Sequence, residues 1–220
     1  SWDRFFNTAR MLYDNHMNTE EACNTMCDIM MTRDRKMRLM VKKHFSPEDY
    51  FSVRNHMIGT GMIGGKACGM LLSRAIVRNL AWDINEVLEP HDSFFIGSDV
   101  YYTYIVDNGF WDIRVRQREE TEYFSLAEEF ARRLKNGVFS EEMKNHFLHI
   151  LEYYGQDPFI VRSSSILEDG FGNAFAGKYE SVFCANRGSL EERLAEFENA
   201  IKTVYASSMS LSALDYRKRR

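Results

Sequence analysis

The chain has 220 residues, of which 45% are apolar and 27% are charged. These proportions are typical of a folded globular protein and exclude a disordered, collagenous or disulfide-stapled chain. The 28 Lys and Arg residues against 32 Asp and Glu residues give a formal net charge of −4, so we expect no nucleic-acid partner. No apolar run approaches the ~20 residues of a membrane helix, so no membrane association is expected. Four cysteines without a C-x-x-C pair indicate reduced thiols and a cytoplasmic location.

The first 55 residues are predicted to form a helical leader. Apolar residues recur at helical spacing from Trp2 to Tyr13, which predicts a first helix. A second helix is expected to start at Thr19, before two acids, and to carry an apolar stripe as far as Val41. The segment Ser46-Pro-Glu-Asp49 predicts a third helix start, with a cap, a proline in the first turn and an acid three residues on. Because the stripe needs a partner, we expect the leader to pack on a β-rich body.

A glycine-rich segment runs from Gly59 to Lys66 and precedes an amphipathic stretch. Glycines let a backbone approach a phosphate closely, and a helix start offers it free N–H groups. Three functional interpretations compete. A dinucleotide fingerprint fits Gly59, Gly61 and Gly64, but the rest of a βαβ unit is not evident. A Walker loop would lack its first glycine and its magnesium-binding hydroxyl. A Gly-Gly-Lys turn would let Lys66 reach a phosphate as a point charge. The simpler alternative is a glycine-rich turn with an exposed lysine.

The middle of the chain is harder to divide into elements. β-Branched and aromatic residues at 94–96 and 111–115 predict two short strands with a Tyr-rich helix between them. The mixed charges from Arg114 to Glu122 indicate a solvated surface. Further helices are expected over 125–134 and 140–154. His146 and His149 lie three apart on the last of these, but no acid or cysteine with ligand spacing supports a metal site.

A second informative segment follows Asp157-Pro158. Residues 159–161 predict a short strand that delivers Arg162 and three serines at its carboxyl end, where open α/β sheets bind ligands. The fork of an arginine suits phosphate oxygens, and serine hydroxyls add donors. The small-residue loop 170–177 could fold over a bound anion, and residues 179–184 predict the returning strand. The alternative is a β-hairpin whose Arg162 makes only a surface salt bridge.

The last elements are a helix and a basic chain end. Ser189 and Glu192 form a capping box, and an apolar face follows as far as Tyr205. The basic residues from Arg217 to Arg220 are interpreted as solvated, because they are fewer than the clusters that signal nucleic-acid binding.

Several segments together resemble the nucleotide-binding domain of the pyruvate phosphate dikinase and phosphoenolpyruvate synthase family. That family shows the motifs V-G-G-K-G, V-R-S-S-A, A-E-D and S-F-A-G-Q-x-E-T in this order. The similar segments here are Ile63-Gly-Gly-Lys-Ala67, Pro158-Phe-Ile-Val-Arg-Ser-Ser-Ser165, Leu167-Glu-Asp169 and Ala174-Phe-Ala-Gly-Lys-Tyr-Glu-Ser181. The resemblance spans about Gly59 to Arg217, with departures from the family pattern at Ala67, Ser165, Ile166 and Lys178-Tyr179.

The resemblance implies an α+β fold: the N-terminal part of an ATP-grasp type nucleotide-binding domain, over residues 56–220, preceded by the helical leader of residues 1–55. It implies that Lys66 and Arg162 contact the phosphates of ATP and serve catalysis. It also implies that Gly177 and Ser181 line the phosphate region.

The function that the resemblance implies is the ATP-binding portion of a phosphoenolpyruvate synthase or pyruvate phosphate dikinase-like phosphotransferase. Such a portion places the phosphates of ATP for transfer to a histidine carrier domain. The carrier domain, the Mg²⁺ ligands and the other C-terminal domains of the protein are expected outside this chain, so the chain alone should bind nucleotide weakly and turn over nothing. The alternative is a non-catalytic nucleotide-binding or regulatory module of the same fold, and a dinucleotide-dependent oxidoreductase ranks third.

Overall fold

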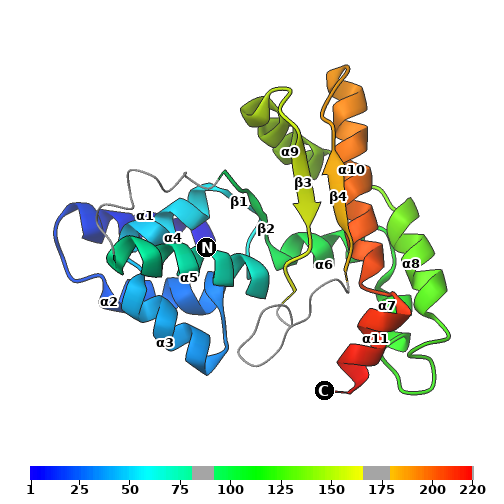
Figure 1. Ribbon diagram of the computed structural model, residues 1–220, viewed down its shortest axis with the longest axis horizontal. Helices are drawn as coiled ribbons and strands as arrows, with labels where there is room; N and C mark the ends of the chain where they lie inside the picture. Colours follow the sequence, from blue (N-terminus) through cyan, green and yellow to red (C-terminus); the bar gives the residue numbers. More distant parts are fainter. Residues whose placement is uncertain (81–91, 166–178, 220) are drawn as a thin grey trace. The chain divides into compact units, whose positions relative to one another are not determined.

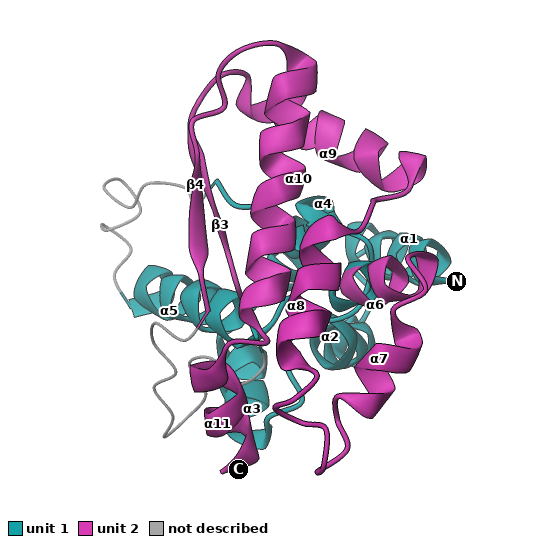
Figure 2. Cartoon of the chain, turned by 90° about the vertical axis from the view of Figure 1, so that its right-hand side faces the viewer, with its two compact units in different colours: residues 1–100, 164–175 teal, residues 101–163, 176–220 magenta. Residues whose placement is uncertain are grey.

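The structure is a computed structural model that describes residues 1–80, 92–165 and 179–219 (Figure 1). The chain divides into two compact units, residues 1–100 with 164–175 and residues 101–163 with 176–220 (Figure 2). Helices dominate the described residues, and their strands form two small sheets of two strands each, so the fold class is α+β as predicted. No helix in these ranges is long and apolar enough to cross a membrane.

The leader forms the first helices of unit 1. These are α1 (Trp2–Asp14), α2 (Glu20–Met26), the π-helix η1 (Cys27–Met31), α3 (Arg35–His44) and α4 (Pro47–Asn55). The start of α4 is the predicted capping box, in which Ser46 and Asp49 each bind the other's backbone N–H. A proline at the first helical position completes this start.

The single helix expected from Thr19 to Val41 is wrong. The backbone of Thr32 is extended, with φ −160° and ψ 151°, and it separates η1 from α3. The Thr32 hydroxyl accepts a hydrogen bond from the Asp34 N–H at 3.0 Å, and the Asp34 carboxylate caps the Met37 N–H at 2.8 Å. These local hydrogen bonds compete with a continuous helix, while the apolar spacing on either side of the break stays helical.

The glycine-rich segment lies between β1 (Met57–Ile58) and α5 (Gly65–Leu80), and β2 (Phe95–Ile96) pairs parallel with β1. The register pairs Met57 with Phe95 and Ile58 with Ile96. A small βαβ connection is therefore present, although the sequence pattern did not make it evident. Strands of two residues are too short to produce a period-2 pattern, which explains why it was missed.

The leader and α5 share one hydrophobic core within unit 1. The side chains of Met26, Met30 and Val41 are fully buried in it, together with Cys68 of α5. Within this core the leader packs mainly against the helix α5 and not against a β-rich body.

Unit 2 is built around one long helix, α10 (Leu190–Ser207). It packs against α8 (Ala127–Asn136), α9 (Glu141–Tyr154) and the antiparallel strands β3 (Phe159–Arg162) and β4 (Ser181–Cys184) (Figure 1). The ring of Phe197 on α10 lies 5.1 Å from the rings of both Phe147 and Phe159. This aromatic cluster holds the hairpin of β3 and β4 on the central helix, because aromatic pairs at such distances are favourable.

The remaining helices are α6 (Ser98–Asp107), which starts in unit 1, α7 (Trp111–Arg116) and α11 (Leu211–Lys218). The strand predicted at 111–115 is therefore wrong. Ile113 is buried in α7, while Trp111 and Val115 are about half exposed. The β-branched residues suggested a strand, but this short helix buries a single side chain and leaves its other apolar groups in solvent.

Candidate phosphate-binding site

The loop from Gly59 to Gly65 has a backbone that only glycine adopts freely. The φ angles of Gly59, Gly61 and Gly64 are +71°, +84° and +89°. A methyl group on Gly64 would also overlap the carbonyl oxygen of Ser164. The glycines of this segment are thus needed for the loop conformation and for the close approach of another segment.

The start of α6 holds one side of this loop. The Asp99 carboxylate accepts hydrogen bonds from the Thr60 N–H at 2.7 Å and from the Thr60 hydroxyl at 2.8 Å. The Met62 N–H donates to the Ser98 hydroxyl at 3.2 Å. The residues that follow β2 therefore fix the loop that follows β1, which is the consequence of pairing the two strands in parallel.

The two motifs singled out in the sequence meet at the start of α5. The Ala67 N–H donates to the Ser164 hydroxyl at 2.9 Å, and the Gly65 N–H donates to the Ser165 carbonyl at 3.1 Å. Two N–H groups of the first turn of α5 are thus satisfied by the serine segment. The expectation that this helix start offers free N–H groups to a phosphate is wrong for Gly65 and Ala67. An anion at this helix start would therefore have to be bound by side chains.

Lys66 is the side chain best placed for that role in unit 1. It lies in the first turn of α5 and is half-buried. Its neighbours Gly65 and Ala67 are both tied to the serine segment, so its backbone position is fixed from either side. A lysine at this end of a helix adds a full positive charge to the positive end of the helix dipole, which favours an anion.

In unit 2, Arg162 and Ser181 face each other across the β3–β4 hairpin. They form a register pair at the end of β3 and the start of β4, and both are exposed. Side chains of directly opposed residues lie about 5 Å apart at their Cβ atoms on the same face of a sheet. Arg162 forms no ion pair within the described part of the chain. A cationic fork and a hydroxyl therefore lie together in solvent, a combination suited to phosphate oxygens.

The same face of the hairpin carries an apolar pair. Ile160 is 57% exposed and Phe183 is 63% exposed, and the two residues are register partners two positions along from Arg162 and Ser181. The opposite face carries Val161 and Cys184, which are turned toward α10. Alternation along each strand thus produces an open face that is apolar at one end and cationic at the other.

The structure places three of the four predicted site residues and does not describe the fourth. Lys66 belongs to unit 1, whereas Arg162 and Ser181 belong to unit 2 and lie opposite each other. Gly177 lies outside the described residues. The roles of Ser164 as a helix cap and of Asp99 as a loop anchor were not predicted. Asp99 follows a short strand and a glycine, which is a possible helix-start signal, but nothing in the sequence connects it with Thr60.

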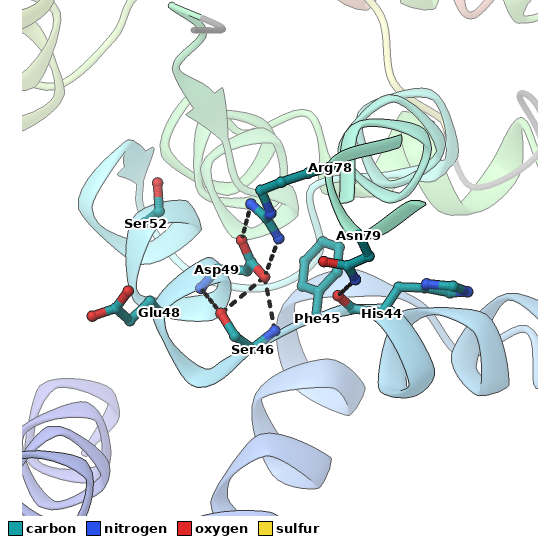
Figure 3. Close-up of a pocket in the computed structure, with 8 residues that line it drawn as sticks. All are labelled: His44, Phe45, Ser46, Glu48, Asp49, Ser52, Arg78 and Asn79. Carbon is teal, nitrogen blue, oxygen red and sulfur yellow. Dashed lines mark hydrogen bonds and ion pairs between the residues drawn. The ribbon is translucent and has the colours of Figure 1, made fainter. Parts of the chain in front are cut away.

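The structure also contains a polar cavity away from these motifs. It has a volume of about 550 Å³ and lies between the start of α4 and the end of α5 (Figure 3). Arg78 forms two hydrogen bonds with the Asp49 carboxylate in it, at 2.9 and 2.8 Å, and Asn79 donates to the His44 carbonyl. The Arg78 guanidinium is paired with the Asp49 carboxylate, and Glu48 adds a second acid to the lining, so the cavity is poorly suited to an anionic ligand.

Neither metal binding nor thiol chemistry is indicated by the described residues. No group of three or more His, Cys, Asp or Glu side chains in these ranges is arranged to hold a metal ion. Burial raises the pKa of the Cys68 thiol to about 12 and that of the Cys184 thiol to about 11, so both stay protonated near neutral pH.

Fold and site together define an α+β domain with a lysine-bearing glycine-rich turn and an arginine-bearing strand end, both suited to phosphate groups. The comparison with known families agrees with this description. The family model of the pyruvate phosphate dikinase AMP/ATP-binding domain matches residues 60–220, so the chain belongs to that family. Neither the curated proteins nor the solved structures gave a match.

Proposed function

We propose that the chain binds ATP through its phosphates, with Lys66 and Arg162 as the contacting cations and with Ser181 and Gly177 lining the phosphate region. The observation that carries the proposal is the open face of the β3–β4 hairpin. There an exposed arginine lies opposite a hydroxyl, two register positions from an exposed pair of apolar side chains on the same face. A nucleotide needs the same combination, because it has an anionic end and an aromatic end.

The chain connection supports bringing Lys66 and Arg162 to one ligand. Ser164, which caps the helix that carries Lys66, follows Arg162 by two residues. Two cations at one polyphosphate would position it and neutralise part of its charge. Catalysis of phosphoryl transfer consists largely of these two effects.

The finer function that we propose is that of an ATP-grasp type portion of a cytoplasmic phosphoenolpyruvate synthase or pyruvate phosphate dikinase-like phosphotransferase. In this proposal the chain places the phosphates of ATP, and a histidine on another domain of the protein accepts one of them. Mg²⁺ would accompany the nucleotide and neutralise its charge, with protein ligands from outside this chain. The residues of this chain bind and orient the phosphates.

Calorimetric titration of the full-length protein with ATP tests the proposal, because this chain alone is expected to bind nucleotide weakly. Charge-assisted hydrogen bonds contribute about 1.5–3 kcal/mol, so Lys66→Ala and Arg162→Ala should each weaken ATP binding about ten- to a hundredfold. The matched controls are Lys135→Ala and Arg187→Ala, which remove the same charges from exposed positions on α8 and after β4. The controls should leave the affinity within twofold. If the two site variants also stay within twofold, the proposed function is wrong.

A further inference from the structure

A hydrogen bond joins the leader of the chain to the glycine-rich loop 59–65. The Ile63 N–H donates a hydrogen bond to the Met30 carbonyl at 2.9 Å. The side chain of Ile63 is 4% exposed and belongs to the core cluster that also contains Met30 and Met31. Ile63 is three residues before Lys66 in the chain, so this contact holds the segment that leads into the proposed phosphate ligand.

The Met30 carbonyl can accept this hydrogen bond because the π-helix η1 ends at Met31, one residue later. The Thr32 N–H closes the last π turn on the Cys27 carbonyl, and the chain then becomes extended. The carbonyls after Cys27 therefore have no partner within the helix, and a buried carbonyl needs one. Ile63 provides that partner for Met30. π-Helical turns are rare and occur frequently at functional sites.

The other hydrogen bonds that hold the loop are made by residues on either side of Ile63. Asp99 and Ser98 hold Thr60 and Met62, and the serine segment holds Gly65 and Ala67. Between these two sets lies Ile63, whose N–H is bound by the Met30 carbonyl. The matched family region begins at residue 60, so the comparison assigns no role to the π-helix of the leader.

We propose that η1 is a positioning element of the nucleotide site, and that Ile63 is its positioning residue: the leader sets the position of Lys66 through the contact between Met30 and Ile63. This inference rests on the proposed function, because it assumes that Lys66 binds a phosphate of ATP. Supporting groups of a binding site must hold their ligands within about half an ångström, and loosening them weakens binding without removing any ligand.

The first test measures ATP affinity and melting temperature on the full-length protein. Ile63→Ala keeps the backbone hydrogen bond to Met30 but removes the buried side chain that holds the loop against the leader. It should therefore weaken ATP binding about tenfold, as happens when groups that support a binding site are removed. Ile63→Val, which keeps most of the side chain, should restore most of that affinity. Phe6→Ala is the control, because Phe6 is buried in the same core cluster but lies on α1 beside Trp2 and Phe5. It should lower the melting temperature and leave the affinity of the folded protein within twofold.

The second test measures amide hydrogen exchange over residues 59–67 without nucleotide. Ile63→Ala should accelerate exchange in this loop at least tenfold, whereas Phe6→Ala should leave it unchanged. The inference is overturned if Ile63→Ala behaves like Phe6→Ala in both measurements. It is also overturned if Lys66→Ala weakens ATP binding while Ile63→Ala does not. If Lys66→Ala itself has no effect, the proposed function fails, and hydrogen exchange alone then decides whether the leader holds the loop.

Discussion

Two glycines that lie close together in the sequence differ in their backbone conformation and in their surroundings. Gly64 has a positive φ and lies against the Ser164 backbone, whereas Gly69 lies inside α5 with open space where its Cβ would be. The sequence alone shows two glycines in one segment. In the structure, Gly64 lies at the contact between the glycine-rich loop and the serine segment, whereas Gly69 occupies an ordinary helical position.

These two positions give opposite predictions for the same substitution. Gly64→Ala should lower the melting temperature, because the positive φ costs an alanine about 1–2 kcal/mol and the methyl group would displace Ser164. Gly69→Ala should raise it by about 2–4 °C, because alanine is better than glycine in a helix by up to about 1 kcal/mol. Thermal unfolding followed by circular dichroism measures both. A stabilised Gly64→Ala variant would contradict the described loop.

At the site, the sequence predicted where the cationic residues lie but not the hydrogen-bond partner of Ser164. Lys66 and Arg162 were selected because their residue types and neighbours suit phosphate, and the structure places them on a helix start and a strand end as the pattern predicted. Ser164 was expected to donate to a ligand, yet its hydroxyl accepts from α5. A hydroxyl both donates and accepts, so its partner depends on which segment lies beside it, and that is set by the tertiary fold.

At the scale of elements, signals carried by neighbouring residues were predicted best. The capping boxes at Ser46 and Ser189 are formed, and the helix after Ser140 ends at Gly155. Elements decided by longer-range packing were predicted poorly: the break at Thr32, the helix at 111–116 and the pairing of β1 with β2. The first group depends on hydrogen bonds within one turn, whereas the second depends on partners that the local pattern does not reveal.

The end of α5 supplies a prediction at this scale. Arg78 joins α5 to the start of α4 through its two hydrogen bonds with Asp49, whose side chain is only 17% exposed (Figure 3). Because the arginine itself is 40% exposed, solvent screening limits the contribution of the pair to about 1 kcal/mol. Arg78→Met should therefore lower the melting temperature by about 2–4 °C.

The matched control is Arg132→Met on α8. Arg132 pairs with Glu129 of its own helix and its side chain is 64% exposed, so the loss of this pair should change the melting temperature by less than 1 °C. Equal effects of the two substitutions would mean that the link between α4 and α5 contributes no more than a surface pair within one helix.

At the scale of the whole molecule, the leader belongs to the unit that carries Lys66. Its buried side chains and those of α5 lie in one cluster within unit 1. The boundary between a leader of residues 1–55 and a nucleotide-binding domain of residues 56–220 remains a prediction. Whatever the evolutionary boundary, the shared core means that the helix with Lys66 depends on the leader for its packing.

Removing residues 1–45 tests this dependence. The deletion would expose Cys68 and Leu71 of α5, which are buried beside leader residues, and burial of each apolar side chain contributes roughly 1.5–3 kcal/mol. The shortened chain should be less soluble or melt at a lower temperature. Leu39→Ser is the control, because Leu39 is 62% exposed and its loss should be neutral. An unchanged melting curve after the deletion would contradict a shared core.

A crystal structure of the protein with a non-hydrolysable ATP analogue would show whether Lys66 and Arg162 bind one nucleotide. We expect the Lys66 ammonium and the Arg162 guanidinium both to lie within about 3.2 Å of phosphate oxygens of one nucleotide, with Ser181 beside them. The claim would be contradicted by a nucleotide whose phosphates bind elsewhere, for example in the cavity at Asp49 and Arg78. It would equally be contradicted if the two cations lay more than about 15 Å apart with the nucleotide bound, since one triphosphate cannot reach both at hydrogen-bond distance.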